Sequence, residues 1–350
     1  MDEKPRVLHP SMPASKSVLI TGFEPFGGHT TNISATVAVI LGSVRSILNP
    51  WTDETVDLEV TARVLPVDAN GARDSAERWR SGERWDAILH MGLCESCELP
   101  RVERLARDQL HMRIPDNQGR QCTEETLDGG GARGCWVDPG AFVRGGRFSG
   151  AEVSDDAGAF VCNETYFHTL AALGDEGDGH PVPTPALFVH LPHQKVMPVE
   201  DALEFVKGIL PKLVFPYPPD AVHVVAASIT NGSGLPLVAR RGPDQRDAGL
   251  WEFPGGKCEP GEPWDRALRR EIKQELGLEV TPNRLLGTWL RPGGDACYVI
   301  HLVGARLNQP SATPTLSVHD AWMWVDLPTA DSLAWAGRDG EMHRLLASLV

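Results

Sequence analysis

The stretch GKCEPGEPWDRALRREIKQELGL, residues 256–278, joins a loop rich in glycine and proline to a charged helical pattern. The pattern predicts a helix over residues 263–276. Glu271, Gln274 and Glu275 are spaced by three and four residues, so a helix places them on one face. Oxygen ligands on one face suit Mg²⁺, a hard cation that bridges phosphates. The plainer interpretation of the same residues is a solvated, charged helix.

The length of 350 residues predicts two domains, because a domain commonly has about 150 residues. The stretch at residues 256–278 belongs to the second of them. Residues 222–229 predict the first strand of a strand-rich unit over residues 222–350. The run PKLVFPYPP, residues 211–219, holds four prolines in nine residues. Proline fixes φ and disfavours helix in the residue before it, so residues 211–221 are predicted to form a stiff, extended linker.

The N-terminal half shows an α/β pattern. Apolar runs at residues 18–21, 86–91 and 186–191 predict buried strands, and residues 31–41 and 163–173 predict helices between them. Such alternation favours a largely parallel sheet, here over residues 17–210. Residues 1–16 carry charge and proline without an apolar core, so they are predicted to be a disordered tail rather than a secretion signal.

Composition excludes several classes of partner. The formal net charge of −14 argues against binding to a nucleic acid polymer, which needs a basic surface. No apolar run is long enough to span a membrane. Seven cysteines, an odd number, do not resemble a secreted disulfide framework and indicate a cytoplasmic protein. Cys94 and Cys97 form one C-x-x-C pair, which is interpreted as two thiols in a loop.

A segment rich in glycine and arginine covers residues 128–150. Two interpretations are open: a mobile surface loop, or a basic segment that meets an acidic partner. Because ordering glycine costs the most backbone entropy, the mobile loop is the prediction.

Three residues of the N-terminal half suggest nucleophilic catalysis. Cys162 directly precedes a helical pattern, and a helix N-terminus favours the thiolate. His190 ends a buried apolar run, and Glu103 follows the strand predicted at residues 86–91. A cysteine peptidase needs a thiolate, an imidazole and a group that orients the imidazole. Each residue alone has a plainer interpretation, as a small core side chain or a satisfied polar group.

Sequence blocks around these residues resemble pyroglutamyl peptidase I in order and spacing. They are TGFEPFGG (residues 21–28), VERLA (102–106), RIPDN (113–117), DAGAFVCN (156–163) and FVHLP (188–192). The resemblance implies an open α/β sandwich that removes N-terminal pyroglutamate from peptides without a cofactor. It assigns Cys162 as nucleophile, His190 as general base and acid, and Glu103 as the orienting carboxylate.

The same resemblance implies contacts with the substrate and with other subunits. An apolar slot for the neutral lactam ring would be lined by residues carried over from the motifs: Phe23, Phe26, Asn32, Phe160 and Val161. Members of the family commonly form oligomers, so a homo-oligomer through the peptidase domain is expected.

Residues 256–278 resemble the Nudix box. The resemblance implies an α/β/α fold with a mixed sheet and hydrolysis of a nucleoside di- or triphosphate linkage. Mg²⁺, with Mn²⁺ as the alternative, would be held by Gly256, Glu271, Gln274 and Glu275, with Glu271 also catalytic. Gln274 stands where the family has glutamate, and Val318 stands where another metal-binding glutamate is common.

Residues 239–257 are similar to the Nudix subgroup that cleaves oxidised or modified nucleotides such as 8-oxo-dGTP. In that subgroup a polar residue reads the base, and Asp339 is the matching position. The sequence therefore predicts a bifunctional hydrolase that acts on pyroglutamyl peptides and nucleotides. Two alternatives remain: a peptidase regulated by an impaired, nucleotide-binding Nudix domain, or an active Nudix hydrolase with an inert peptidase scaffold.

Overall fold

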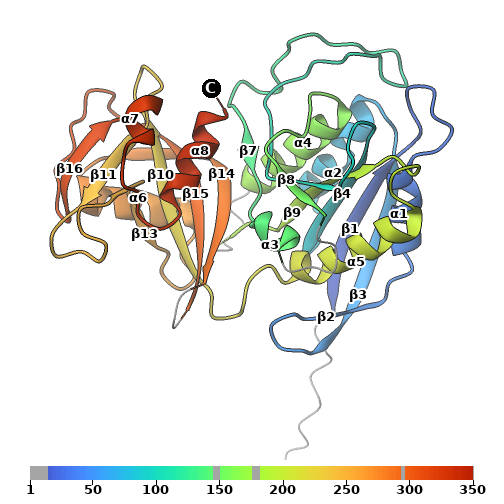
Figure 1. Cartoon of the computed structure of the whole chain (residues 1–350), viewed down its shortest axis with the longest axis horizontal. Helices are drawn as coiled ribbons and strands as arrows, with labels where there is room; N and C mark the ends of the chain where they lie inside the picture. The colour runs from blue at the N-terminus through green and yellow to red at the C-terminus, as the bar shows by residue number, and fades with distance from the viewer. Residues whose placement is uncertain (1–14, 145–149, 176–181, 293–295, 350) are drawn as a thin grey trace, which may run out of the picture.

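A computed structural model describes residues 15–144, 150–175, 182–292 and 296–349, and most of the tail predicted over residues 1–16 lies outside this range. The described chain forms two α/β units (Figure 1). Within it, no helix has both the length and the apolar character that crossing a membrane requires. The predicted α/β class is confirmed in both units.

The N-terminal unit is built on a seven-stranded sheet in the order β2-β3-β1-β4-β9-β5-β8. Neighbouring strands from β3 to β9 run parallel, while the β2–β3 and β5–β9 pairs are antiparallel. The three predicted strands lie in or overlap β1, β4 and β9. The strands are β1 (Lys16–Phe23), β2 (Ser46–Leu48), β3 (Thr55–Leu65), β4 (Ala87–Cys94), β5 (Arg101–Glu103), β8 (Glu152–Ser154) and β9 (Ala186–Pro192).

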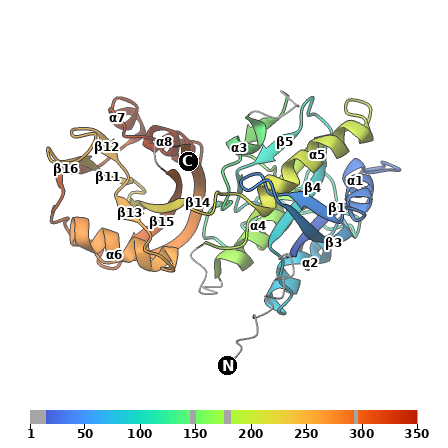
Figure 2. The ribbon, with the colours of Figure 1, turned by 90° about the horizontal axis from the view of Figure 1, so that it is seen from below.

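Helices cover both faces of this sheet, which is why β4 and β9 are apolar almost throughout (Figure 2). Helices α1 (Ile33–Leu41) and α5 (Val199–Val214) pack together on one face. Helices α2 (Ala69–Arg80) and α4 (Val161–Asp175) pack on the other.

The C-terminal unit combines two sheets with helices outside them. A mixed sheet in the order β13-β10-β15-β14 has β10 parallel to β15, and an antiparallel sheet has the order β12-β11-β16. Its strands are β10 (Val222–Thr230), β11 (Leu237–Arg241), β12 (Trp251–Glu252), β13 (Gly255–Lys257), β14 (Val280–Pro292), β15 (Cys297–Leu307) and β16 (His319–Trp324). Its helices are α6 (Trp264–Leu276), α7 (Leu327–Asp331) and α8 (Asp339–Ala347).

The extended linker begins later than predicted. Helix α5 continues through Pro211 to Val214, so residues 211–214 are helical. Leu210, Leu213 and Val214 are all buried against the core of the N-terminal unit. Their burial outweighs the hydrogen bond that Pro211 cannot donate.

The prediction of a mobile loop over residues 128–150 is wrong for most of its described part. Strand β7 (Arg133–Gly134) pairs with β6 (Leu105–Ala106), and α3 (Gly140–Val143) follows. Trp136 is buried in the core of the C-terminal unit, with its ring centroid 5.3 Å from that of Trp264. Gly134 permits this packing, since a Cβ there would lie 2.4 Å from the backbone of Leu286. The partner of this segment is therefore the second domain, and residues 145–149 lie outside the described residues.

Candidate active sites

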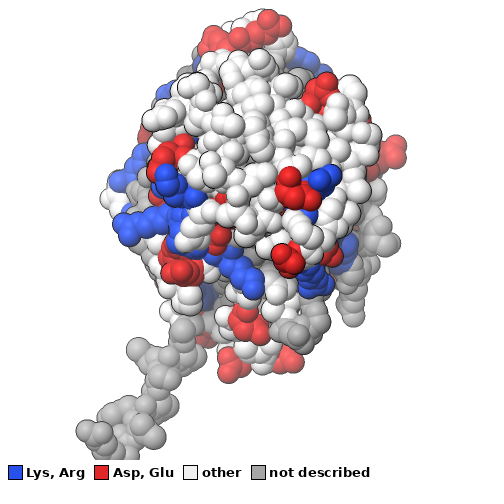
Figure 3. All heavy atoms as spheres, turned by 90° about the vertical axis from the view of Figure 1, so that its left-hand side faces the viewer, with Lys and Arg blue, Asp and Glu red and all other residues white. Residues whose placement is uncertain are grey.

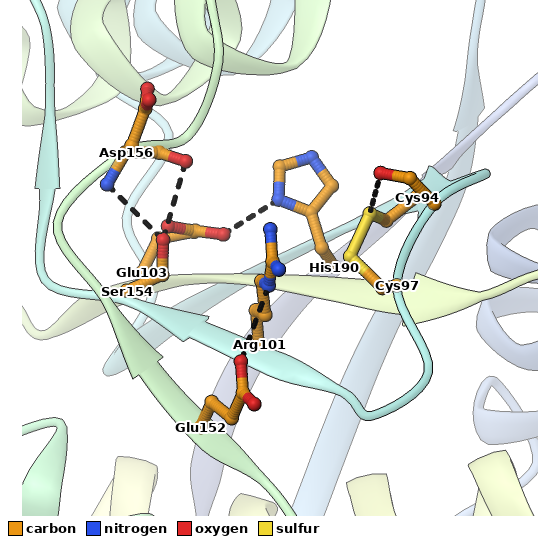
Figure 4. Close-up of a disulfide and its surroundings, with 9 residues drawn as sticks. Cys94, Cys97, Arg101, Glu103, Glu152, Ser154, Asp156 and His190 are labelled. Carbon is orange, nitrogen blue, oxygen red and sulfur yellow. Dashed lines mark hydrogen bonds and ion pairs between the residues drawn. A yellow bond between two sulfur atoms is a disulfide. The ribbon is translucent and has the colours of Figure 1, made fainter.

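Glu103 and His190 meet because β5 and β9 are antiparallel neighbours. Glu103 lies opposite Phe188, so His190 is its diagonal neighbour on the same face of the sheet. His190 Nδ1 and Glu103 Oε1 are 2.7 Å apart, and Glu103 is fully buried. The hydroxyl of Tyr166 donates to the backbone carbonyl of Glu103 at 3.2 Å and fixes this end of β5. Figure 4 shows the Glu103 carboxylate turned toward the imidazole.

Cys162 approaches the same imidazole from the first turn of α4. Burial lowers the pKa of His190, but hydrogen bonds to Cys162 and Glu103, together with the negative charge of both groups, raise it to about 10. An imidazolium between a thiolate and a carboxylate is the arrangement that nucleophilic cysteine catalysis uses. The structure thus brings together the three residues predicted to form a triad.

Gly92 provides the space for this thiol and was missed by sequence reasoning. It lies in β4, and a Cβ there would be 2.8 Å from Cys162 Sγ and 3.0 Å from the ring of Phe188. The signal that could have revealed it is a glycine inside an otherwise apolar strand, which often marks a close approach.

A small, nearly closed apolar pocket with a volume of about 10 Å³ adjoins Cys162. The five predicted substrate-binding residues all line it: Phe23, Phe26, Asn32, Phe160 and Val161. The rings of Phe26 and Phe160 have centroids 5.7 Å apart. This pocket has the apolar character that suits a flat, neutral ring, and its side chains would have to move apart to admit one.

Asn32 differs from the other four because its amide is already engaged. It caps α1, where its Oδ1 accepts from the backbone N–H of Ser34 at 3.1 Å, and its Nδ2 donates to the carbonyl of Glu24 at 3.1 Å. Asn32 therefore holds the shape of the loop that carries Phe23 and Phe26.

A wider cleft of about 760 Å³ opens from the triad. Arg101, His111, Arg113 and Asp156 line it, beside His190 and Cys162. Arg101 lies directly opposite His190 in the β5–β9 pairing, so its side chain leaves the same face of the sheet. The cleft has room for a peptide that extends from a ring held in the apolar pocket.

Cys94 and Cys97 form a disulfide, so the interpretation of two free thiols is wrong. The bond closes the turn after β4, on the side of His190 opposite Glu103 (Figure 4). Cys94 also lines the wide cleft. The spacing of three residues between the two cysteines does not show whether they form a disulfide, because that depends on the geometry of the turn between them.

The second candidate site lies on α6 of the C-terminal unit. Arg270 pairs with Glu262 at 2.7 Å and with Glu271 at 2.7 Å, which ties the loop to the helix. Gly256 lies against the carboxylate of Glu271, since a Cβ there would be 2.4 Å from Cδ. The helix ends at Gly277, whose positive φ of 67° suits glycine.

Glu275 faces two further carboxylates. Burial raises its pKa to about 7, with the negative charges of Glu252 and Glu271 adding to the effect and His319 opposing it. Glu252 was missed by sequence reasoning, although it stands in the WEFPGG stretch quoted for the subgroup resemblance. It pairs with His319 at 2.9 Å and with Arg241.

The carboxylate oxygens gathered around α6 are the kind of ligand that a divalent cation binds. Glu252 and Glu271 both raise the pKa of Glu275 by their charge, which adds to the larger effect of burial, and Gly256 lies against Glu271. As they stand, no three His, Cys, Asp or Glu side chains among the described residues are arranged as metal ligands. Gln274 is exposed and does not join the carboxylates.

Asp339, the predicted base-reading residue, begins α8. Its Oδ1 accepts from the backbone N–H of Phe253 at 2.7 Å, and burial raises its pKa to about 8. The raised pKa favours the protonated carboxyl group, which can donate a hydrogen bond. The Phe253 ring stacks on Trp335, with centroids 5.6 Å apart, which places this tryptophan in the packing of the domain.

The face of the C-terminal unit that points away from the peptidase unit is unevenly charged. Figure 3 shows Lys and Arg gathered beside acidic side chains over part of this face, and a broad area with neither. Asp320 and Arg240 form an ion pair at 2.7 Å, and both side chains are exposed.

Comparisons with known proteins divide the chain in the same way. The family model for pyroglutamyl peptidase matches residues 16–230, and the NUDIX domain model matches residues 219–346. The pyrrolidone-carboxylate peptidase of Clavibacter michiganensis subsp. michiganensis is 34% identical over 181 residues, which cover 51% of this chain and 78% of that protein.

A relative of the C-terminal unit and a solved structure add to this. The CTP pyrophosphohydrolase of Escherichia coli is 36% identical over 100 residues, covering 29% of this chain and 73% of that protein. The solved pyrrolidone carboxyl peptidase from Thermococcus litoralis superposes with a TM-score of 0.50 at 27% identity, covering 57% of this chain and 94% of that one.

Proposed function

This chain belongs to the pyroglutamyl peptidase family and carries a Nudix domain, which makes it a two-domain hydrolase, and we propose that Cys162, His190 and Glu103 remove N-terminal pyroglutamate from peptides. The observation that carries the proposal is that the three contacting side chains and an apolar pocket adjoin each other. The Glu103–His190–Cys162 contacts lie beside an apolar pocket that Phe23, Phe26 and Phe160 line.

The reaction follows from these positions. Cys162 Sγ attacks the carbonyl carbon that joins the pyroglutamyl residue to the next residue, while the lactam ring lies against Phe26 and Phe160. His190 donates its proton to the leaving amine, and a thioester remains on Cys162. His190 then takes a proton from water, which attacks the thioester and releases pyroglutamate. Glu103 holds the imidazole in orientation and stabilises its charged form.

A fluorogenic assay tests this proposal. Pyroglutamyl aminomethylcoumarin is compared with alanyl aminomethylcoumarin, which has a free amine in place of the lactam. Cys162→Ser should lose activity by about 1,000-fold or more, whereas Cys122→Ser, a change at a half-buried cysteine elsewhere, should not. Equal cleavage of both substrates, or equal loss in both variants, would contradict the proposal.

For the Nudix domain we propose hydrolysis of a nucleoside di- or triphosphate linkage at Gly256, Glu271 and Glu275, with Glu252 as a further ligand. Mg²⁺ held there, or Mn²⁺ in its place, would supply positive charge that polarises the phosphate and favours attack by water. Glu271 is oriented by Arg270, and Glu275 receives a hydrogen bond from the backbone N–H of Gly255 at 3.2 Å.

The nucleotide itself is part of the proposal. A protonated Asp339 can donate to an acceptor on a base, which supports a modified nucleotide such as 8-oxo-dGTP. The E. coli relative is named for CTP, so CTP belongs in the same test. Diphosphate release from both nucleotides, measured with Mg²⁺, should disappear in Glu271→Gln and persist in Glu279→Gln, a change at an exposed residue after α6.

Failure of that test would favour the alternative in which the Nudix domain binds nucleotide and regulates the peptidase. Exposed Gln274 and the apolar Val318 are the residues that favour it. The other alternative, an inert peptidase scaffold, is opposed by the contacts of the triad. Association into a homo-oligomer through the peptidase unit and a cytoplasmic location remain predictions.

A further inference from the structure

The boundary between the two units holds a cavity of about 740 Å³, called here the interdomain pocket. The peptidase unit contributes residues 129–131, and the Nudix unit contributes parts of β10, β14 and β15 and of α7 and α8. Neither the triad nor the carboxylates of α6 are among the described residues that line it. Small-molecule sites commonly have about 300–1,000 Å³ and lie at domain boundaries.

One wall of the interdomain pocket is apolar. Leu286, Val325 and Ala330 are buried side chains of the Nudix core, and Leu346 and Leu349 of the C-terminal segment are partly buried beside them. Leu346 and Leu349 leave apolar surface exposed on this wall, so a ligand whose apolar body covers them removes that surface from water.

Arg284 brings positive charge to the other wall. It extends from β14 to the glycine loop of the peptidase unit, where a Cβ on Gly131 would lie 2.6 Å from its Nη2. Its Nε is buried and has no hydrogen-bond partner among the described residues. Burial and the positive charges of Arg133 and Arg306 lower the pKa of Arg284. Arg306 also lines the pocket and is exposed.

The acidic groups nearby are occupied by other partners. Asp108 accepts hydrogen bonds from the backbone of the glycine-rich segment. Asp128 pairs with Arg133 at 2.6 Å, and Asp326 caps α7. Asp108 and Asp128 attract Arg284 from a distance, but less strongly than burial and the two arginines act against it. Within the described part of the chain, the guanidinium of Arg284 is thus a partly buried cation without a paired anion, and such groups are stabilised by an acidic ligand.

We propose that the interdomain pocket binds a small organic anion, whose carboxylate or phosphate monoester pairs with Arg284 and Arg306 while its apolar body covers Leu346 and Leu349. Because both units contribute walls, the bound anion contacts the peptidase and the Nudix domain at once. The site shares no residue with either proposed reaction, so anion binding can be tested whether or not the protein catalyses them.

Two fluorescent probes test the proposal on the full chain. Anilinonaphthalene sulfonate is an apolar anion, and phenylnaphthylamine is the same ring system without the acidic group. The variants are Arg284→Gln, Arg306→Gln and, as the matched control, Arg344→Gln, which changes an exposed arginine of α8 outside the pocket. Thermal unfolding of each variant shows whether it is folded.

The anionic probe should bind about tenfold or more weakly to Arg284→Gln, and more weakly to Arg306→Gln, than to the wild type or Arg344→Gln. The neutral probe should bind all four proteins alike. Phenylbutyrate and phenyl phosphate then compete for the site, and the stronger competitor identifies the acidic group. Unchanged binding of the anionic probe in both pocket variants, equal weakening of both probes, or displacement by neither competitor would overturn the proposal.

Discussion

Glu103→Gln removes the charge that faces His190 while it keeps the size of the side chain. Glu103 is fully buried, and its Oε1 lies 2.7 Å from Nδ1 of His190. A hydrogen bond to a charged group contributes about 1.5–3 kcal/mol, and one pKa unit corresponds to about 1.36 kcal/mol. The pKa of His190 should therefore fall by about 1 to 2 units and kcat by about 10- to 150-fold.

The pH profile of kcat/KM for pyroglutamyl aminomethylcoumarin measures this directly, because it follows groups of the free enzyme. His190 must donate a proton to the leaving amine, so activity falls as pH rises through its pKa, which is about 10 in the folded protein. Loss of the neighbouring charge lowers that pKa and moves the alkaline limb to lower pH. Glu98→Gln, at an exposed position, is the control. An unchanged alkaline limb with wild-type activity would refute the role given to Glu103.

Three further predictions concern the same site. Gly92→Ala should lower kcat by about tenfold or more, since its Cβ would lie 2.8 Å from Cys162 Sγ; full activity in a folded variant would count against the close approach. Phe26→Ala should reduce kcat/KM by about tenfold, mainly through KM, when the pyroglutamyl substrate is titrated, and an unaffected KM would argue against the ring pocket. Iodoacetamide followed by peptide mass spectrometry should label Cys162 first, because burial raises the pKa of the four other free cysteines in the described chain; preferential labelling elsewhere would contradict this.

The peptidase site could be predicted in large part because its residues lie in short motifs at strand and helix ends. Phe23 ends β1, His190 lies near the end of β9 and Cys162 begins α4. Carboxyl ends of neighbouring parallel strands meet at one edge of a sheet, which brings such motifs together. Gly92 and Arg101 were missed because their positions depend on which strands are neighbours, and local sequence does not specify that.

The errors in the fold have the same origin in long-range contacts. Glycine density indicated a mobile segment at residues 128–150, but burial of Trp136 in the second domain orders it. Proline content indicated an extended chain at Pro211, but packing of the helix on the peptidase core prevails. The pairing of Cys94 with Cys97 depends on the turn that follows β4. Glu252 joins the α6 carboxylates only through the fold of its short strand.

The most direct test of the central claim is the covalent intermediate on Cys162. Wild-type protein is mixed with a pyroglutamyl peptide, quenched in acid within the first turnover and digested for mass spectrometry. We expect the peptide that contains Cys162 to carry the added mass of one pyroglutamyl group, and to lack it when His190→Ala replaces the wild type. Release of pyroglutamate without this adduct, or an adduct on another cysteine, would contradict catalysis by the proposed triad.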